Sequence, residues 1–313
     1  MKMLYNLVYL LGYVISLLPL WTLHIISDML YFFLYHIIGY RKSIVRENLA
    51  GSFPEKNGKE LKILEKEFYS FFCDNLMETV KLFSISDKQL RKRMAFIGIP
   101  QMVDAMRKED KQFVFIYLGH CGNWEWISSL TARIHEFAPE VTGGQIYHPL
   151  RNKVFDRLLL GLRSRFDGVN IPMKETLRYI LKQRKKGERT IIGFIADQIP
   201  KWNSIHHWTQ FMNRKTPVFT GTEQIGKQVD ALFYYAHVDR IRRGYYRCTL
   251  TRMVENTDQY KEFEITDKYF KLLEQSIRTH PTIWLWTHNR WKRTYEEYVK
   301  RQKQVTDAKA NEV

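Results

Sequence analysis

The pattern of apolar and polar positions divides the chain into a strongly apolar N-terminal stretch and a longer body. Between Lys2 and Arg41 the only formally charged side chain is Asp28. Pro19 interrupts this stretch, so we expect two helices that meet near it. Residues 3–26 provide the roughly 20 apolar positions that span a bilayer. The second apolar run, residues 29–39, is shorter and is expected to lie in the membrane interface.

The N-terminal stretch has two other interpretations. A cleaved signal peptide has a shorter apolar region followed by a small-x-small cleavage site, and neither feature is present. A buried helical hairpin of a soluble domain stays open as an alternative. The dense basic residues from Arg41 onward favour a cytoplasmic body by the positive-inside tendency. We therefore expect membrane anchor helices over 1–40, an α/β domain over 41–303 and a disordered tail over 304–313.

The body alternates helical and strand patterns. Residues 59–83 place apolar side chains at helical spacing, whereas residues 113–119 (FVFIYLG) form a short continuous apolar run that is typical of a buried strand. Further strands are predicted at 140–147, 190–197, 231–238 and 246–251, and further helices at 124–134, 152–165, 175–183 and 261–279. This alternation predicts an α/β fold, in which helices flank a central, mostly parallel but mixed sheet.

Charge and cysteine content limit the possible partners. The chain has 313 residues and a formal net charge of +16, which predicts attraction to an anionic membrane surface, an acidic carrier protein or a nucleic acid. We expect no nucleic-acid partner, because no nucleic-acid-binding motif is present; a non-catalytic protein that binds a membrane surface or a nucleic acid is the distant alternative. Cys73, Cys121 and Cys248 are odd in number and far apart, which argues against a disulfide framework or a structural zinc site.

The strongest candidate for chemistry is the segment that follows the strand predicted at 113–119. His120 comes directly after this strand, and Glu125 follows five positions later. On a continuous helix these side chains would point about 140° apart, so they can meet only if the chain turns at Gly119 and Gly122. We expect His120 to act as general base on a hydroxyl, Glu125 to orient its ring, and free amides at the following helix start to stabilise an oxyanion.

A metal or cofactor is not expected at this position. The consecutive residues His120 and Cys121 cannot easily face one ion, and catalytic zinc needs three well-placed protein ligands. Histidine and glutamate at this spacing are also common in ordinary core or surface positions. The function therefore depends on further sequence blocks.

Several blocks occur in a fixed order along the chain. They are Arg46–Leu49 with Ser52–Glu55, GHCGNWEW at 119–126, Tyr147–Asn152, Ala196–Gln198 and Trp284–Trp291. With these blocks the chain resembles the bacterial lipid A late acyltransferases (lauroyl and myristoyl transferases), within the wider group of glycerolipid acyltransferases that carry a His-x-x-x-x-Asp/Glu motif. The resemblance covers roughly residues 5 to 295. The chain differs from the family pattern after Gln198, where residues 201–207 stand in place of a glycine-rich segment.

The resemblance implies an O-acyltransferase that takes a fatty acyl chain from an acyl carrier protein or CoA thioester. The implied acceptor is a hydroxyl of a lipid A precursor, as in lipopolysaccharide biosynthesis, at the cytoplasmic face of the inner membrane. An acidic carrier protein would complement the positive charge of the chain. A lysophospholipid, an aminolipid or a glycosylated lipid is the alternative acceptor, because the same chemistry would serve each of them.

Five further residues are expected to contact substrate. Arg151 and Arg163 lie before and on a basic predicted helix, where an arginine fork can hold a phosphate. Asp197 ends a strand on the same sheet edge as His120, and Asn123 lies inside the His120 block. Arg290 follows the Trp-Leu-Trp run. The alternatives are a solvated helix face for the first two arginines, a turn cap for Asp197 and a cation at the membrane surface for Arg290.

Overall fold

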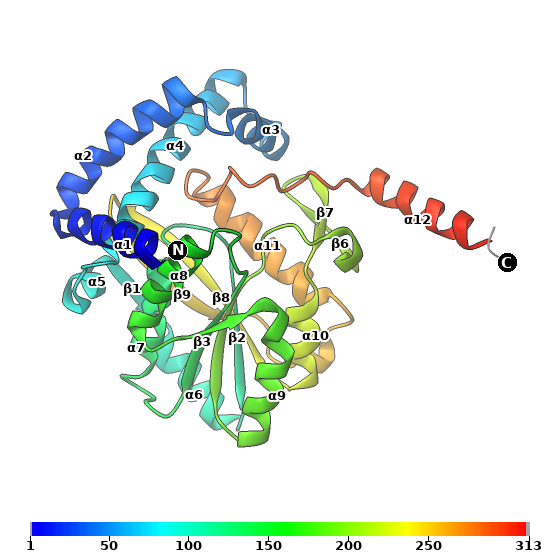
Figure 1. Cartoon of the computed structure of the whole chain (residues 1–313). Coiled ribbons are helices and arrows are strands. Elements are labelled where there is room, and N and C mark those ends of the chain that lie inside the picture. The colour runs from blue at the N-terminus through cyan, green and yellow to red at the C-terminus, as the bar shows by residue number, and fades with distance from the viewer. Residues whose placement is uncertain (1, 311–313) are drawn as a thin grey trace.

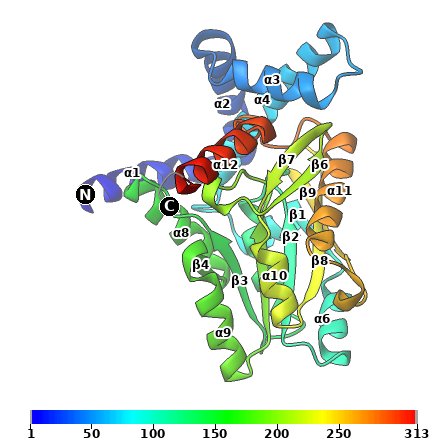
Figure 2. The same cartoon turned by 90° about the vertical axis from the view of Figure 1, so that its right-hand side faces the viewer.

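The computed structural model describes residues 2–310, with side chains described through residue 304. An α/β sheet domain carries a layer of N-terminal helices at one end (Figures 1 and 2). The central sheet has seven strands in the order β1-β9-β8-β2-β5-β3-β4, and all neighbours are parallel except β8 and β9. The expected mixed, mostly parallel sheet is therefore confirmed. Its strands are β1 (Met94–Ile97), β2 (Phe113–Leu118), β3 (Thr142–Tyr147), β4 (Val169–Pro172), β5 (Thr190–Ile195), β8 (Leu232–Arg242) and β9 (Tyr245–Arg252).

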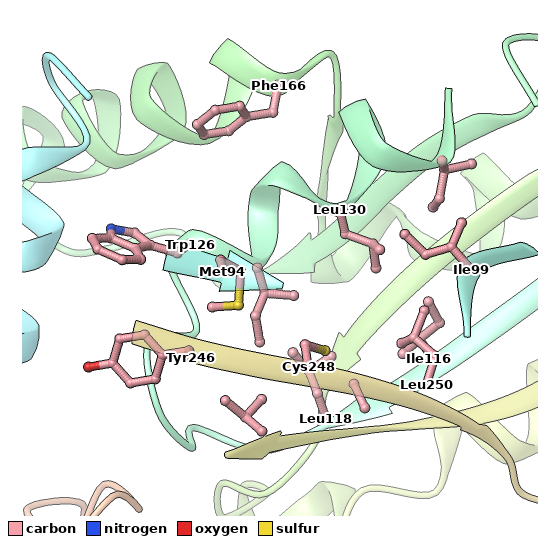
Figure 3. Packing of buried hydrophobic residues seen from close by; sticks show 14 of the residues in the cluster. Met94, Ile99, Ile116, Leu118, Trp126, Leu130, Phe166, Tyr246, Cys248 and Leu250 are labelled. Carbon is pink, nitrogen blue, oxygen red and sulfur yellow. The ribbon is translucent and has the colours of Figure 1, made fainter. Parts of the chain in front are cut away.

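Alternate side chains of β2 face two separate hydrophobic cores. Val114, Ile116 and Leu118 belong to the first core, whereas Phe113 and Phe115 belong to the second. Figure 3 shows the first core, in which side chains of the sheet meet those of the helical segments that cover it. Because both faces are covered, β2 is apolar at every position, and this explains its continuous apolar run.

Helices cover both faces of the sheet (Figures 1 and 2). On the side of the first core lie α5 (Asp87–Arg93), α6 (Ile99–Lys108), α7 (Leu130–Ile134) and α8 (Lys153–Arg163). On the side of the second core lie α9 (Thr176–Lys186), α10 (Gly221–Gln228), α11 (Glu264–Thr279) and the hairpin of β6 (His207–Phe211) and β7 (Arg214–Val218). Short 3-10 turns, of which Trp126–Ser129 concerns the site, connect some of these elements.

The N-terminal stretch forms two helices that break at Leu18–Pro19, as the sequence predicts. The helices of this layer are α1 (Lys2–Leu17), α2 (Leu20–Tyr31), its π-helical continuation η1 (Phe32–Ile38), α3 (Lys42–Ser52) and α4 (Gly58–Lys81). Within residues 2–310, the segment that is long and apolar enough to cross a membrane is the 19-residue run Leu20–Ile38 and not the expected 3–26, because the break at Pro19 divides the latter. Only 17% of its apolar window is buried, so this segment is not the buried hairpin of a soluble domain.

Polar contacts attach the N-terminal helices to the sheet domain. Ser27 on α2 donates a hydrogen bond to the buried carboxylate of Asp74 on α4, at 2.7 Å. Arg243, in the turn between β8 and β9, pairs with both Asp28 and Asp74. One carboxylate on α4 therefore joins α2 to the sheet.

The C-terminal end of the described chain is a helix. It is α12 (Tyr295–Ala310), which passes residue 304, where the predicted tail begins. An ion pair between Glu297 and Arg301, one helical turn apart, stabilises the exposed helix. Residues 311–313 lie outside the described residues.

Candidate functional site

The site is built where two neighbouring parallel strands end. Leu118 at the end of β2 lies opposite Ile195 at the end of β5. His120 and Asp197 each come two residues after these positions. The Nδ1 atom of His120 lies 2.6 Å from Oδ1 of Asp197. The main-chain N–H of His120 also donates to Oδ2 of the same carboxylate at 2.9 Å. Strand register therefore brings together two residues that are 77 positions apart.

The environment of Asp197 keeps its carboxylate ionised. Burial by itself would raise the pKa of Asp197, but the His120 imidazole and hydrogen bonds from His120 and Trp284 outweigh burial and lower this pKa to about 2. Because an ionised carboxylate only accepts, we assign the proton of a neutral His120 ring to Nδ1. The lone pair on Nε2 is then free to accept a proton. The amide nitrogen of Gln198 lies 3.4 Å from this Nε2 atom, and the ring is 17% exposed.

The two glycines near His120 have different surroundings. Gly122 has a φ of +60°, a conformation that side chains rarely adopt, so it supplies the expected turn. At Gly119 a Cβ atom would lie 2.6 Å from the side-chain methyl of Leu273 on α11, which would have to move. The sequence prediction of a turn is therefore confirmed, with the left-handed residue at Gly122.

A second segment, residues 283–285, holds the loop of His120 in place. The N–H of Leu285 donates to the carbonyl of His120 at 3.1 Å, and the N–H of Gly122 donates to the carbonyl of Ile283 at 2.9 Å. Between them, the indole of Trp284 donates to Oδ2 of Asp197 at 2.8 Å. These bonds fix the main chain on both sides of Cys121.

The expected contact between Glu125 and His120 is not the one that the structure shows. Both carboxylate oxygens of Glu125 accept hydrogen bonds from Arg163 on α8, at 2.9 and 2.6 Å, and Glu125 is 6% exposed. Burial lowers the pKa of Arg163, but the Glu125 carboxylate outweighs burial and raises this pKa above its usual value. After Gly122 the chain enters a 3-10 turn that directs Glu125 to α8, while β5 supplies the carboxylate that holds His120.

We expect Glu125→Ala to lower the free energy of unfolding by about 3 kcal/mol, because it leaves the half-buried guanidinium of Arg163 without its partner. Denaturant unfolding of the detergent-solubilised chain measures this loss. The matched control is Glu140→Ala, which breaks an exposed pair with Arg107 and should cost at most about 1 kcal/mol. Equal losses for the two variants would contradict the structural role of Glu125.

The other predicted substrate contacts lie in different environments. Asn123 is fully buried: its amide donates to Glu78 on α4 at 2.8 Å, and its side-chain oxygen accepts from the N–H of Trp126. This position makes Asn123 a support of the loop and not a surface contact. Arg151 lies on an exposed loop between β3 and α8, where it is accessible to a ligand.

Arg290 is also buried, which contradicts both a direct surface contact and the alternative of a cation at the membrane surface. Its guanidinium donates to the carbonyl of Pro217 at 2.7 Å. Burial lowers the pKa of Arg290 to about 10, although the nearby Asp197 carboxylate opposes this effect. Arg290 therefore stays charged at neutral pH and offsets the negative charge of Asp197 from inside the protein.

A mostly apolar cavity of about 50 Å³ lies on the first-core side of the sheet, next to the loop that carries His120. Its wall includes Trp124, whose ring packs edge-on against the His120 ring with the centroids 5.3 Å apart. It also includes Leu118 and Ile195, the last residues of β2 and β5, and, deeper in the sheet, Gly193. The His120 site thus adjoins an apolar space on the first-core side of the sheet.

Sequence reasoning missed three supporting residues of the site. Gln198 and Trp284 contact His120 and Asp197, and Glu78 accepts hydrogen bonds from Asn123 and from the hydroxyl of Tyr246. Gln198 and Trp284 both lie in blocks that mark the resemblance, which was the available signal. Glu78 sits inside an ordinary amphipathic helix pattern, where nothing distinguished it.

Comparison with known proteins identifies the family of the chain. No curated protein gives a significant match to the chain. A family model described as "bacterial lipid A biosynthesis acyltransferase" matches residues 2–293, which is nearly the whole chain. The chain therefore belongs to the bacterial lipid A biosynthesis acyltransferase family, and it is an acyltransferase.

Proposed function

We propose that the chain is a late acyltransferase of lipid A biosynthesis, which transfers a fatty acyl chain from a carrier thioester to a hydroxyl of a membrane-bound lipid A precursor. The observation that carries this proposal is the contact between Nδ1 of His120 and Asp197, in an imidazole that packs against Trp124 of the cavity wall. A base next to an apolar space suits a hydroxyl that attacks the thioester of a fatty acid.

In the proposed reaction, Nε2 of His120 accepts the proton of the acceptor hydroxyl while its oxygen attacks the thioester carbonyl. Asp197 stabilises the imidazolium that forms. The amide of Gln198 lies beside the same nitrogen and is placed to donate to the developing oxyanion. Collapse of the tetrahedral intermediate releases the thiolate, which takes the proton from His120. The products are an ester and a free thiol, so no cofactor is required.

Attachment to a membrane is proposed from the N-terminal helices. More than half of the exposed large apolar side chains of the described residues lie between residues 3 and 40. The helix α1 lies beside α8 (Figures 1 and 2), and the guanidinium carbon of Arg157 on α8 lies 4.4 Å from the centroid of the Tyr5 ring on α1. Burial of α1 in the lipid interface would therefore bring the side of the domain that carries Arg163 close to lipid headgroups. The cytoplasmic face of the inner membrane is the proposed location.

The donor and the anionic substrate groups are proposed from charge. The net charge of +16 favours an acidic acyl carrier protein over a neutral donor, with acyl-CoA as the other candidate. Arg151 is exposed and accessible to a phosphate of the lipid or of the donor. Glu125 would act in this scheme through Arg163, by fixing its guanidinium.

Mass spectrometry of lipids from cells with and without the gene tests this function. We expect a lipid A species to gain the mass of one acyl chain only when the gene is present. If lipid A is unchanged and a phospholipid or an aminolipid changes instead, the proposed acceptor is wrong.

The cavity beside His120 makes a separate prediction about the acyl chain. A Cβ atom at Gly193 would lie 3.7 Å from Leu118, an ordinary contact, so Gly193→Val can fill the cavity without displacing the main chain. We expect the ratio of kcat/KM values for two donors to shift toward the shorter chain by about tenfold for each methylene group excluded. Competing donors of different length measure this ratio. Gly58→Val, at a position open to solvent, is the control, and an unchanged preference in a folded Gly193→Val protein would remove the cavity from the scheme.

A further inference from the structure

A cluster of two histidines and one carboxylate lies apart from His120. His237 and Asp239 lie on β8, and His280 follows the last turn of α11. The Nε2 atoms of His237 and His280 lie 2.9 and 3.0 Å from Oδ1 of Asp239. The three ligand atoms all lie within 4.8 Å of one another. The proposed acyl transfer uses none of these residues.

The Ser276 hydroxyl lies within hydrogen-bond distance of three groups. They are the carbonyl of Leu272 at 3.0 Å, and the Tyr235 hydroxyl and Nδ1 of His237, each at 2.7 Å. We assign the single Ser276 proton to the Leu272 carbonyl, so that Nδ1 of His237 donates to Ser276. In this tautomer the lone pair of Nε2 points at the Asp239 carboxylate, 2.9 Å away, as two ligands of one cation do.

The carboxylate of Asp239 is oriented in the same way. Arg247 on β9 donates from Nε and Nη2 to Oδ2, at 3.2 and 3.1 Å. Oδ1 is thereby left to face the two imidazoles. A hydroxyl therefore contacts the far nitrogen of His237, and a cation contacts the far oxygen of Asp239. Outer partners of this kind, which orient the ligand atoms, are typical of metal sites.

We propose that His237, Asp239 and His280 bind one divalent transition-metal ion, with zinc as the expected ion. Two imidazoles and one carboxylate form a donor set that zinc prefers, and water completes the tetrahedron. Bond lengths of about 2.0–2.1 Å place tetrahedral ligand atoms about 3.3 Å apart. The two pairs that include Asp239 would need to separate by a few tenths of an ångström, and the two imidazole nitrogens, which lie within 4.8 Å of each other, would need to approach. The side chains are 16–34% exposed, which lets an ion reach them from solvent.

The bound ion would connect β8 to the segment that supports the active site. His280 immediately precedes residues 281–285, which include Trp284, the donor to Asp197, and Leu285, the donor to the His120 carbonyl. An ion at His280 would fix the start of this segment on the sheet. We therefore expect the ion to stabilise the fold, and its role does not depend on which lipid is acylated.

Calorimetric titration of zinc into the full chain tests the site, after treatment with a chelator and removal of any affinity histidines. We expect one equivalent to bind, an increase in Tm of at least about 2–4 °C at saturation, and at least tenfold weaker binding for His237→Ala and for His280→Ala. The control is His206→Ala, which removes an exposed histidine elsewhere and should bind zinc as the wild type does. Undiminished binding in the double variant His237→Ala/His280→Ala would overturn the proposal.

A measurement on the wild type covers the case in which these variants fail to fold. Cobalt added to the chelator-treated chain should give the absorption bands of a tetrahedral ion with nitrogen and oxygen ligands, and zinc should displace it. If no such bands form, and the ¹⁵N shifts of His237 show a protonated ring, the cluster is an ion pair between histidine and Asp239 only, and the metal site is excluded.

Discussion

Replacing His120 by alanine is expected to lower kcat for acyl transfer by about 10²–10⁴-fold, the usual contribution of a positioned general base. The variant has no group that can accept the acceptor proton at the position of Nε2. Its fold should persist, because the main-chain bonds of residue 120 to Asp197 and Leu285 do not depend on the side chain. The binding of donor and acceptor should also change little. The loss should therefore appear in kcat rather than in KM.

The measurement is the initial rate of ester formation by purified protein in detergent or vesicles, normalised to the folded fraction. His206→Ala removes an exposed histidine and serves as the control. A folded His120→Ala protein with near-normal turnover would exclude His120 as the base.

Asp197→Asn is expected to have the second-largest effect, a loss of about 10²–10³-fold in kcat. Asparagine keeps the shape of the side chain, but its amide can donate to Nδ1 of His120. The ring proton then moves to Nε2, where no lone pair remains for the acceptor hydroxyl. Asp197 is a positioning residue here, because it acts through His120.

The pH dependence of this variant has a definite sign. The folded pKa of Asp197 is lowered from 3.8 to about 2, so the stabilisation by its carboxylate is complete above pH 4 and is lost only as the pH falls toward 2. The ratio of the wild-type rate to the Asp197→Asn rate should therefore show no step from the titration of Asp197 between pH 5 and 8, because its pKa lies below this range. Asp104→Asn, at an exposed aspartate, is the matched control. A ratio that falls toward 1 at pH 5 would show that Asp197 is protonated there and would contradict its role.

The elements that the sequence predicted well are those whose pattern depends on burial. The continuous run of β2 and the helical stripe of α4 follow from contact with the cores, and Pro19 ended the first helix as expected. Elements with weak patterns were missed. β4 is a four-residue edge strand that ends in proline, and the hairpin of β6 and β7 turns at Met212 and Asn213 without a glycine. Neither carries the usual signal of a strand or of a hairpin turn.

The site was predicted in its location but not in its pairing. His120 and Asp197 were both expected at the carboxyl edge of the sheet, because each follows a buried strand. The choice between Glu125 and Asp197 as the partner of the imidazole depended on strand order and register. These place β5, which precedes Asp197, directly beside β2. Glu125 is closer in sequence, but a local turn directs it to Arg163 on another helix. Proximity along the chain was therefore a poor guide to contact in the fold.

A double-variant cycle on kcat tests most directly whether Asp197 works by holding His120 as the base. The four proteins are the wild type, His120→Ala, Asp197→Asn and the combination of both changes, each assayed for ester formation at equal folded concentration. If the carboxylate acts through the imidazole, the double variant should be no slower than His120→Ala alone. A double variant whose loss is the product of the two single losses would show that these residues act independently, and the proposed mechanism would then be wrong.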